Sequence, residues 1–280
     1  MKAAAYSKMI KSISASDLIC RCCGNRVYVL SDAKESICNF CEAYVSSSDR
    51  DVVNGNRDVE RNLTLMQSSA VSGKWAEGVA SADALAASKD PYFLYGASNF
   101  YRFFSDYTYY GVDYGLGGFM YSNAEKRSDE SQRNKYNAVA LISKSREFLF
   151  RALKIIKDMH NPEDPLLFIK FMANVKLRRK AHAARALEEV NAMADMDVMK
   201  LYANIVWNSG SKGTAAEKYL ESELLRGISN SLYYVAVRAA MRNDMDGAIG
   251  ILDTLAARSN MPSALYLSIR LRDIRNASEI

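Results

Sequence analysis

The chain has 280 residues, of which 49% are hydrophobic and 25% charged, and this globular composition excludes wholesale disorder. The formal net charge of +5 is mild, so it permits a nucleic-acid partner without requiring one. Lys8 and Lys11 interrupt the N-terminal sequence before an apolar signal-peptide stretch forms, and no uncharged apolar run approaches the roughly 18 residues of a membrane helix. We therefore expect a cytoplasmic protein with no membrane partner.

All five cysteines fall between positions 20 and 41 and form a metal-ligand pattern. Cys20 and Cys23 make one CxxC pair, and Cys38 and Cys41 make a second pair after a gap of 14 residues. Cytosolic thiols stay reduced, so this clustering favours a metal site over disulfides. Four thiolates can converge tetrahedrally on Zn²⁺. We predict one Zn²⁺ ion held by these four cysteines, with iron as the alternative metal.

The two CxxC pairs resemble the zinc-ribbon family. Gly24 directly follows Cys23 and eases the tight turn there, and residues 27–30 are expected to form a strand of a short β-hairpin. Glu42 stands where a second glycine is often found, so we expect the second turn to be less regular. Since protein ligands fill all four positions, the metal should be structural. Cys22 is then a spare thiol.

A polar segment with an Asn54-Gly55 turn signal follows the cysteines. It predicts three parts: a zinc ribbon with an N-terminal extension at 1–46, a linker at 47–60 and a helical domain at 61–280. The helical expectation is supported by the absence of glycine from 119–209 and by an apolar stripe of helical period over residues 137–157. Short breaks at 161–165, 208–213 and 259–262 separate helices of about 12–15 residues.

Small residues recur in this helical part at a fixed spacing. Ala203 and Ala236 lie 33 residues apart, with Ser268 a further 32 along, and each is expected in the middle of a helix. Ala248 lies 33 residues after Ala215, which itself lies 34 after Ala181. Antiparallel helices approach closely only where both carry small side chains. Ala203 and Ala215 lie 12 residues apart, as do Ala236 and Ala248, and this spacing fits such a crossing.

This spacing resembles the tetratricopeptide repeat, a helix–turn–helix unit of about 34 residues. The best match is residues 232–262, and an earlier match at 91–96 puts Gly96 in the small position. The resemblance implies a mostly α-helical protein whose C-terminal part is a solenoid of antiparallel helix pairs. Another α-solenoid or an irregular helical bundle is the alternative.

Residues 92–121 hold thirteen of the 27 Phe and Tyr residues of the chain. Three interpretations remain open: the rings fill the core of a helix pair, they form a wall for a peptide, or they stack on nucleic-acid bases. The third is disfavoured because Arg102 is the only cation there. The candidate partner-binding residues in this block are Tyr92, Tyr95, Tyr101, Tyr107 and Tyr110.

Residues 170–185 form a basic segment with six Lys and Arg residues and no acid. If the segment were one helix, Arg178, His182 and Arg185 would share a face. It is either a surface for RNA or an acidic protein, or an ordinary solvated helix face. The candidate contact residues are Arg178, Arg179, Lys180 and Arg185.

No catalytic constellation is found in the sequence. The two histidines, His160 and His182, have no nucleophile beside them, and no known phosphate-loop or hydrolase motif is present. We therefore expect a non-enzymatic adaptor that binds a protein or peptide through its helical repeats. The alternatives are an RNA- or nucleoprotein-associated factor using the ribbon and residues 170–185, and a structural subunit of a larger assembly.

Overall fold

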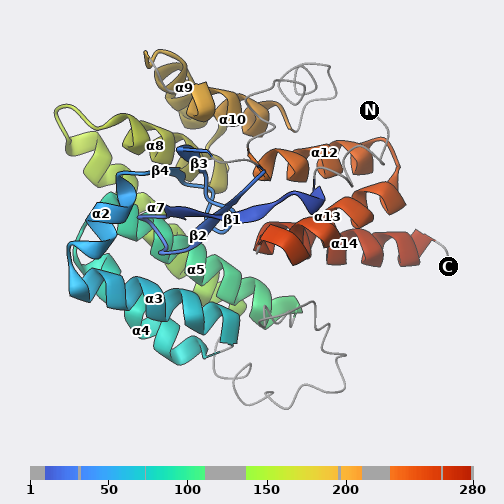
Figure 1. Cartoon of the computed structure of the whole chain (residues 1–280), viewed down its shortest axis with the longest axis horizontal. Coiled ribbons are helices and arrows are strands. Elements are labelled where there is room, and N and C mark those ends of the chain that lie inside the picture. The colour runs from blue at the N-terminus through green and yellow to red at the C-terminus, as the bar shows by residue number, and fades with distance from the viewer. Residues whose placement is uncertain are drawn as a thin grey trace. The chain divides into compact units, whose positions relative to one another are not determined.

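The computed structural model describes residues 10–30, 33–72, 74–110, 137–194, 197–209, 228–259 and 261–278 (Figure 1). The protein is mostly α-helical with a small β region near the N-terminus, as the sequence predicts. The strands are β1 (Ser14–Ile19), β2 (Arg26–Val29), β3 (Glu35–Ile37) and β4 (Tyr44–Ser46). The described helices are α2 (Asp49–Asn54), α3 (Arg57–Ser72), α4 (Trp75–Ala87), α5 (Pro91–Tyr110), α7 (Ala138–Asp158), α8 (Asp164–Lys176), α9 (Lys180–Asn191), α10 (Asp197–Asn208), α12 (Asn230–Met241), α13 (Met245–Ser259) and α14 (Pro262–Ser278).

The chain divides into two compact units. Unit 1 takes its described residues from Met1–Leu18, Arg26–Ser47 and Leu187–Ile280, and unit 2 takes its residues from Ile19–Asn25 and Ser48–Ala186. The predicted parts have different bounds. The expected linker at 47–60 contains α2 and the start of α3, and in α2 only Val53 is buried. Its polar sequence therefore reflects an exposed helix.

The β region consists of two hairpins, where the sequence predicts one. Strand β1 pairs with β2, and β3 pairs antiparallel with β4, with Ser36 opposite Val45. The predicted strand at 27–30 is β2. Each hairpin carries one CxxC pair in its connection, so the strands serve to present the cysteines.

The predicted repeat spacing is present in the C-terminal half of the chain. Helices α8, α10, α12 and α14 begin 33, 33 and 32 residues apart. Ala203, Ala236 and Ser268 each occupy the seventh position of their helix and are 0% exposed. Small residues therefore stand where the repeat requires them.

The second helices of the pairs agree with the prediction only in part. Ala248 of α13 is fully buried, as expected. Ala181 is exposed, and the buried small residue near the start of α9 is Ala183, because the helix begins at Lys180 and turns Ala181 outward. Ala215 lies outside the described residues.

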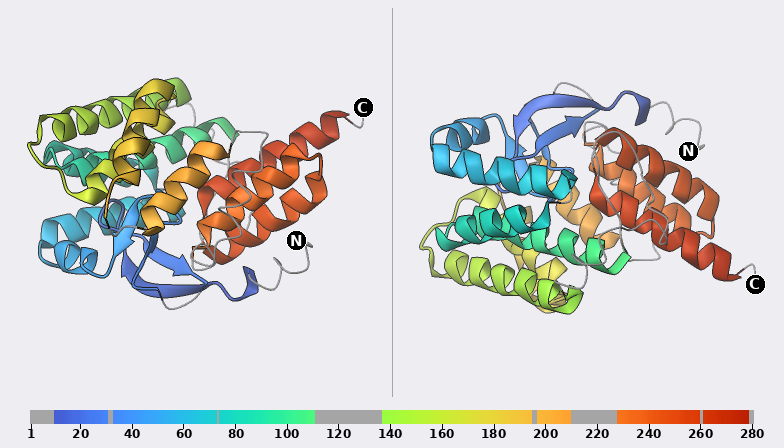
Figure 2. Two further views of the ribbon diagram at one scale, coloured as in Figure 1. Left: turned by 90° about the horizontal axis from the view of Figure 1, so that it is seen from above. Right: turned by 90° about the horizontal axis from the view of Figure 1, so that it is seen from below.

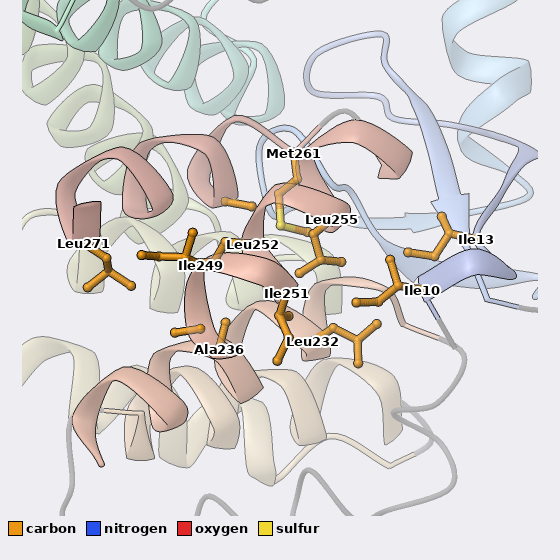
Figure 3. Packing of buried hydrophobic residues seen from close by; sticks show 12 residues of the cluster. Ile10, Ile13, Leu232, Ala236, Ile249, Ile251, Leu252, Leu255, Met261 and Leu271 are labelled. Atoms are coloured by element: carbon orange, nitrogen blue, oxygen red, sulfur yellow. The ribbon is translucent and has the colours of Figure 1, made fainter. Parts of the chain in front are cut away.

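Helices α12, α13 and α14 pack side by side in unit 1 (Figure 2). Leu232 and Ala236 of α12 meet Ala248 and Leu252 of α13 in one apolar cluster, and Ile10 packs against the same cluster (Figure 3). Alanines in this cluster let neighbouring helices approach closely. These helices contain residues 232–262, the best of the predicted tetratricopeptide-like matches.

Three short connections between helices share one backbone conformation. Lys89 between α4 and α5, Arg178 between α8 and α9, and Asn243 between α12 and α13 have φ of 61°, 58° and 65°. A left-handed residue after a helix ends it and turns the chain back. The prediction that Arg178 shares a helix face with His182 and Arg185 is therefore wrong, because α8 ends before Arg178 and α9 begins after it.

The described part of the aromatic block, residues 92–110, contributes to the core of unit 2. Trp75 of α4 stacks on Phe104 of α5 with 4.6 Å between the ring centres. Tyr92, Tyr95 and Tyr101 are at most 5% exposed, which favours the core interpretation over a partner-binding wall. The side chains of Tyr107 and Tyr110, also predicted as partner contacts, lie outside the described residues, as do residues 111–121.

Candidate metal centre

The structure brings together the four predicted ligands. The Sγ atoms of Cys20, Cys23, Cys38 and Cys41 all lie within 4.8 Å of one another, and all four residues are buried. A tetrahedral ion with metal–sulfur bonds of 2.3 Å separates its sulfurs by about 3.8 Å, so a small contraction closes the site. Four buried thiols are a donor set that fits Zn²⁺ or iron.

The two CxxC turns have the same backbone. The N–H of Gly24 donates to the Cys20 carbonyl at 2.7 Å, and the N–H of Glu42 donates to the Cys38 carbonyl at 2.9 Å. Gly24 and Glu42 have φ of 72° and 64°. The expectation of a less regular second turn is therefore wrong, because Glu42 adopts the left-handed conformation that glycine adopts in the first.

Two buried tyrosines hold the Glu42 side chain. Its carboxylate accepts hydrogen bonds from the Tyr202 hydroxyl at 2.9 Å and from the Tyr234 hydroxyl at 3.4 Å. Burial, reinforced by the Glu42 carboxylate, raises the pKa of both tyrosines well above 10.0, so both keep the protons that they donate. These bonds offset the cost of a left-handed side-chain-bearing residue, which is about 1–2 kcal/mol.

A second set of polar contacts fixes Asn39, which lies inside the second CxxC turn. Its Oδ1 accepts from the N–H of Tyr28 at 2.7 Å, and its Nδ2 donates to Asn230 Oδ1 at 2.9 Å and also to Ser229 Oγ. Asn230 in turn donates to the Cys38 carbonyl at 3.2 Å. The start of α12 is thus bonded directly to this turn. Ser229 and Asn230 could not be predicted as partners of Asn39, because they lie about 190 residues away along the chain.

The first CxxC turn is held in unit 2 by a different set of contacts. The Arg21 guanidinium lies 3.9 Å from the centre of the Tyr92 ring and 3.5 Å from the Asp90 carboxylate. The Tyr92 hydroxyl donates to Glu163 at 3.1 Å. Burial, followed by the charge of Glu163, raises the pKa of Tyr92, so this hydroxyl is protonated. Tyr92 therefore positions the turn from within the core.

Gly96 has a role that differs from its prediction. The repeat match places it at a helix crossing, but a Cβ at Gly96 would lie 1.7 Å from the carbonyl oxygen of Cys22. Its missing side chain therefore admits the backbone of the first CxxC turn. Cys22 is buried and is not among the four clustered sulfurs, which agrees with its exclusion as a ligand.

The predicted basic residues separate into two groups. Arg178, Lys180 and Arg185 are exposed, as a contact surface requires. Lys176, which belongs to the same segment, instead donates to Asn99 at 2.6 Å and lies over the Tyr95 ring. The basic segment thus stabilises the core with one residue and offers others to solvent.

Comparison with models of protein families, with curated proteins and with solved structures yields no match. No described helix combines the length and the apolar character needed to cross a membrane. The resemblances to zinc ribbons and tetratricopeptide repeats therefore depend on residue spacing and on the geometry of the turns and helices.

Proposed function

We propose that the protein is a non-enzymatic cytoplasmic adaptor, a helical-repeat scaffold that contains one structural Zn²⁺ ion and binds a protein or peptide. The single observation that carries the metal half of the proposal is the closed cluster of four buried sulfurs. Bound Zn²⁺ would supply about 10–16 kcal/mol of apparent binding free energy to folding. With every position taken by a thiolate, such a centre has no place for a substrate or a reactive water.

Native mass spectrometry of the purified chain tests the metal. We expect one Zn²⁺ per chain of 31.3 kDa, lost in Cys38→Ser and kept in the matched control Cys22→Ser. Visible absorption from a thiolate–iron centre would contradict zinc. Equal thermal stability with and without a chelator would contradict a structural role for any metal.

The binding half of the proposal is supported by the repeat geometry. Helices α8, α10, α12 and α14 begin about 33 residues apart, and repeat proteins with such a spacing use extended surfaces for recognition. A pull-down at two salt concentrations tests it: we expect a protein partner whose retention changes little with moderate salt. Recovery of nucleic acid alone would contradict it, and a mass in solution at several multiples of 31.3 kDa would favour the assembly-subunit alternative.

A further inference from the structure

The positive charge of the chain is concentrated in one segment of unit 2. Residues 138–185, which form α7, α8 and the start of α9, contain eleven Lys and Arg residues against four Asp and Glu residues. This excess of seven exceeds the net charge of the whole chain, +5, so the remaining residues are slightly acidic. Charge clustered in this way is an electrostatic footprint for an anionic partner.

One face of α7 carries an exposed stripe of cations around an aromatic ring. Arg146, Phe150, Lys154 and Lys157 are all exposed and follow one another at steps of four, four and three residues. These steps place them on one side of the helix, with about 6 Å along the axis between Phe150 and the cation on each side of it. Phe150 is 51% exposed, so its ring is accessible between these cations.

The turn between α8 and α9 adds to this stripe. Helix α8 packs against α7, and the Arg179 guanidinium lies 5.7 Å from the centre of the Phe150 ring. The exposed residues Arg178 and Lys180 flank Arg179 in sequence. The turn therefore brings further positive charge beside the exposed ring.

The cations of the stripe differ from their neighbours in having no acidic partner within the described residues. On the same helix, Lys144 and Arg151 both pair with Glu147 at 3.7 Å. Arg146 and Lys154 have no such ion pair in that part of the chain. Arg146, Lys154 and Lys157 are also exposed, so an external anion can reach the charges around Phe150.

We propose that this surface, formed by Arg146, Phe150, Lys154, Lys157 and the turn at 178–180, binds single-stranded nucleic acid. The cations contact phosphates along the strand, and Phe150 stacks on a base. This activity goes beyond the proposed adaptor function and involves no metal. An acidic peptide would use the charges but has no base to cover the ring, so Phe150 distinguishes the two partners.

Fluorescence anisotropy of the full chain with labelled 12-residue oligouridine and oligothymidine tests the proposal. If about four phosphates are neutralised, a plot of log Kd against log salt concentration should rise with a slope of about 3. Arg146→Gln with Lys154→Gln should lower that slope by about 1.4. The matched control Arg57→Gln with Arg61→Gln removes two exposed charges from α3 and should leave it unchanged.

Phe150→Ala tests the stacking contact separately from the contribution of the charges. Because the ring is half exposed, the variant should fold, as circular dichroism would verify, and binding should weaken about fivefold or more through loss of stacking. Tighter binding of the uridine or thymidine strand would show whether RNA or DNA is the ligand. Absence of binding at low salt, an equal effect of the α3 control, or unchanged affinity in Phe150→Ala would each overturn the proposal. So would equal competition by polyglutamate.

Discussion

Gly96 of α5 meets the backbone of the first CxxC turn, so replacing it by alanine is a direct test of how the turn is seated. The new Cβ would lie 1.7 Å from the carbonyl oxygen of Cys22 and 2.6 Å from its carbonyl carbon, where ordinary contacts are 3.4–4 Å. The obstacle is backbone, so no change of rotamer relieves it. Either α5 or the turn has to move by about 1.7 Å to restore an ordinary contact.

The expected magnitude combines two opposing effects. Overpacking of a filled core costs about 1–3 kcal/mol, and a backbone obstacle places Gly96→Ala at the upper end. Alanine in a helix interior gains up to about 1 kcal/mol over glycine. We therefore expect the unfolding free energy to fall by about 2 kcal/mol. Gly250→Ala in α13, where no atom lies within 4 Å of the added Cβ, is the control and should gain about 0.5–1 kcal/mol.

Urea unfolding followed by circular dichroism measures both variants. The proposed Zn²⁺ ion should also bind more weakly to Gly96→Ala in competition with a chelator, because Cys22 lies between the candidate ligands Cys20 and Cys23. Equal unfolding midpoints for Gly96→Ala and Gly250→Ala would refute the close contact between Gly96 and the Cys22 carbonyl. A change in the slope m without a change in midpoint would point to altered compactness instead.

Three further predictions concern the second CxxC turn. Asn39→Ala removes the donor to Asn230 Oδ1 and the acceptor of the Tyr28 N–H, so urea unfolding should show a loss of about 2–3 kcal/mol. Glu42→Gly relieves the left-handed backbone but removes the acceptor of two buried tyrosine hydroxyls. Glu42→Gln keeps one acceptor oxygen for them. The Gly variant should therefore be about 1 kcal/mol less stable than the Gln variant. The raised pKa values of Tyr202 and Tyr234 keep both neutral in the folded protein, while the unfolded chain ionises near pH 10.0. Stability from these groups should therefore be constant below pH 10.0 and fall as the pH rises above it, which unfolding midpoints and tyrosinate absorbance would record.

Asn39→Ala with unchanged stability would mean that water replaces the lost bonds. Glu42→Gly more stable than Glu42→Gln would mean that backbone strain outweighs the tyrosine hydrogen bonds. Tyrosinate absorbance that follows a single ionisation near pH 10.0 in the folded protein would contradict the burial of Tyr202 and Tyr234.

The features predicted correctly are those that short stretches of sequence determine. The four clustered cysteines follow from local CxxC spacing, and the helix from Ala138 to Asp158 follows from its apolar period. The burial of Ala203 and Ala236 follows from the 33-residue repeat. In each case, the residues that form the pattern are themselves the residues whose structure it specifies.

The features that were missed depend on contacts distant in sequence or on rare backbone conformations. Glu42 accepts from tyrosines at least 160 residues away, and no local pattern announces such a pairing. Arg178 ends a helix in a conformation that glycine or asparagine usually adopts, so composition alone did not mark the break. Phe150 was part of no motif, and its exposure is evident only once the core is defined.

The discontinuity of unit 1 has a consequence for the order in which the protein folds during synthesis. Asn39 bonds to Ser229 and Asn230, which are about 190 residues later in the chain. At 5–20 residues per second, they leave the ribosome about 10–40 s after Asn39. Residues 48–186 of unit 2 have by then emerged as one continuous stretch. The second hairpin therefore completes its contacts only after most of the polypeptide has been made. In a chain stalled before residue 228, Asn39 lacks its partners in Ser229 and Asn230 and is exposed to the cell's quality control.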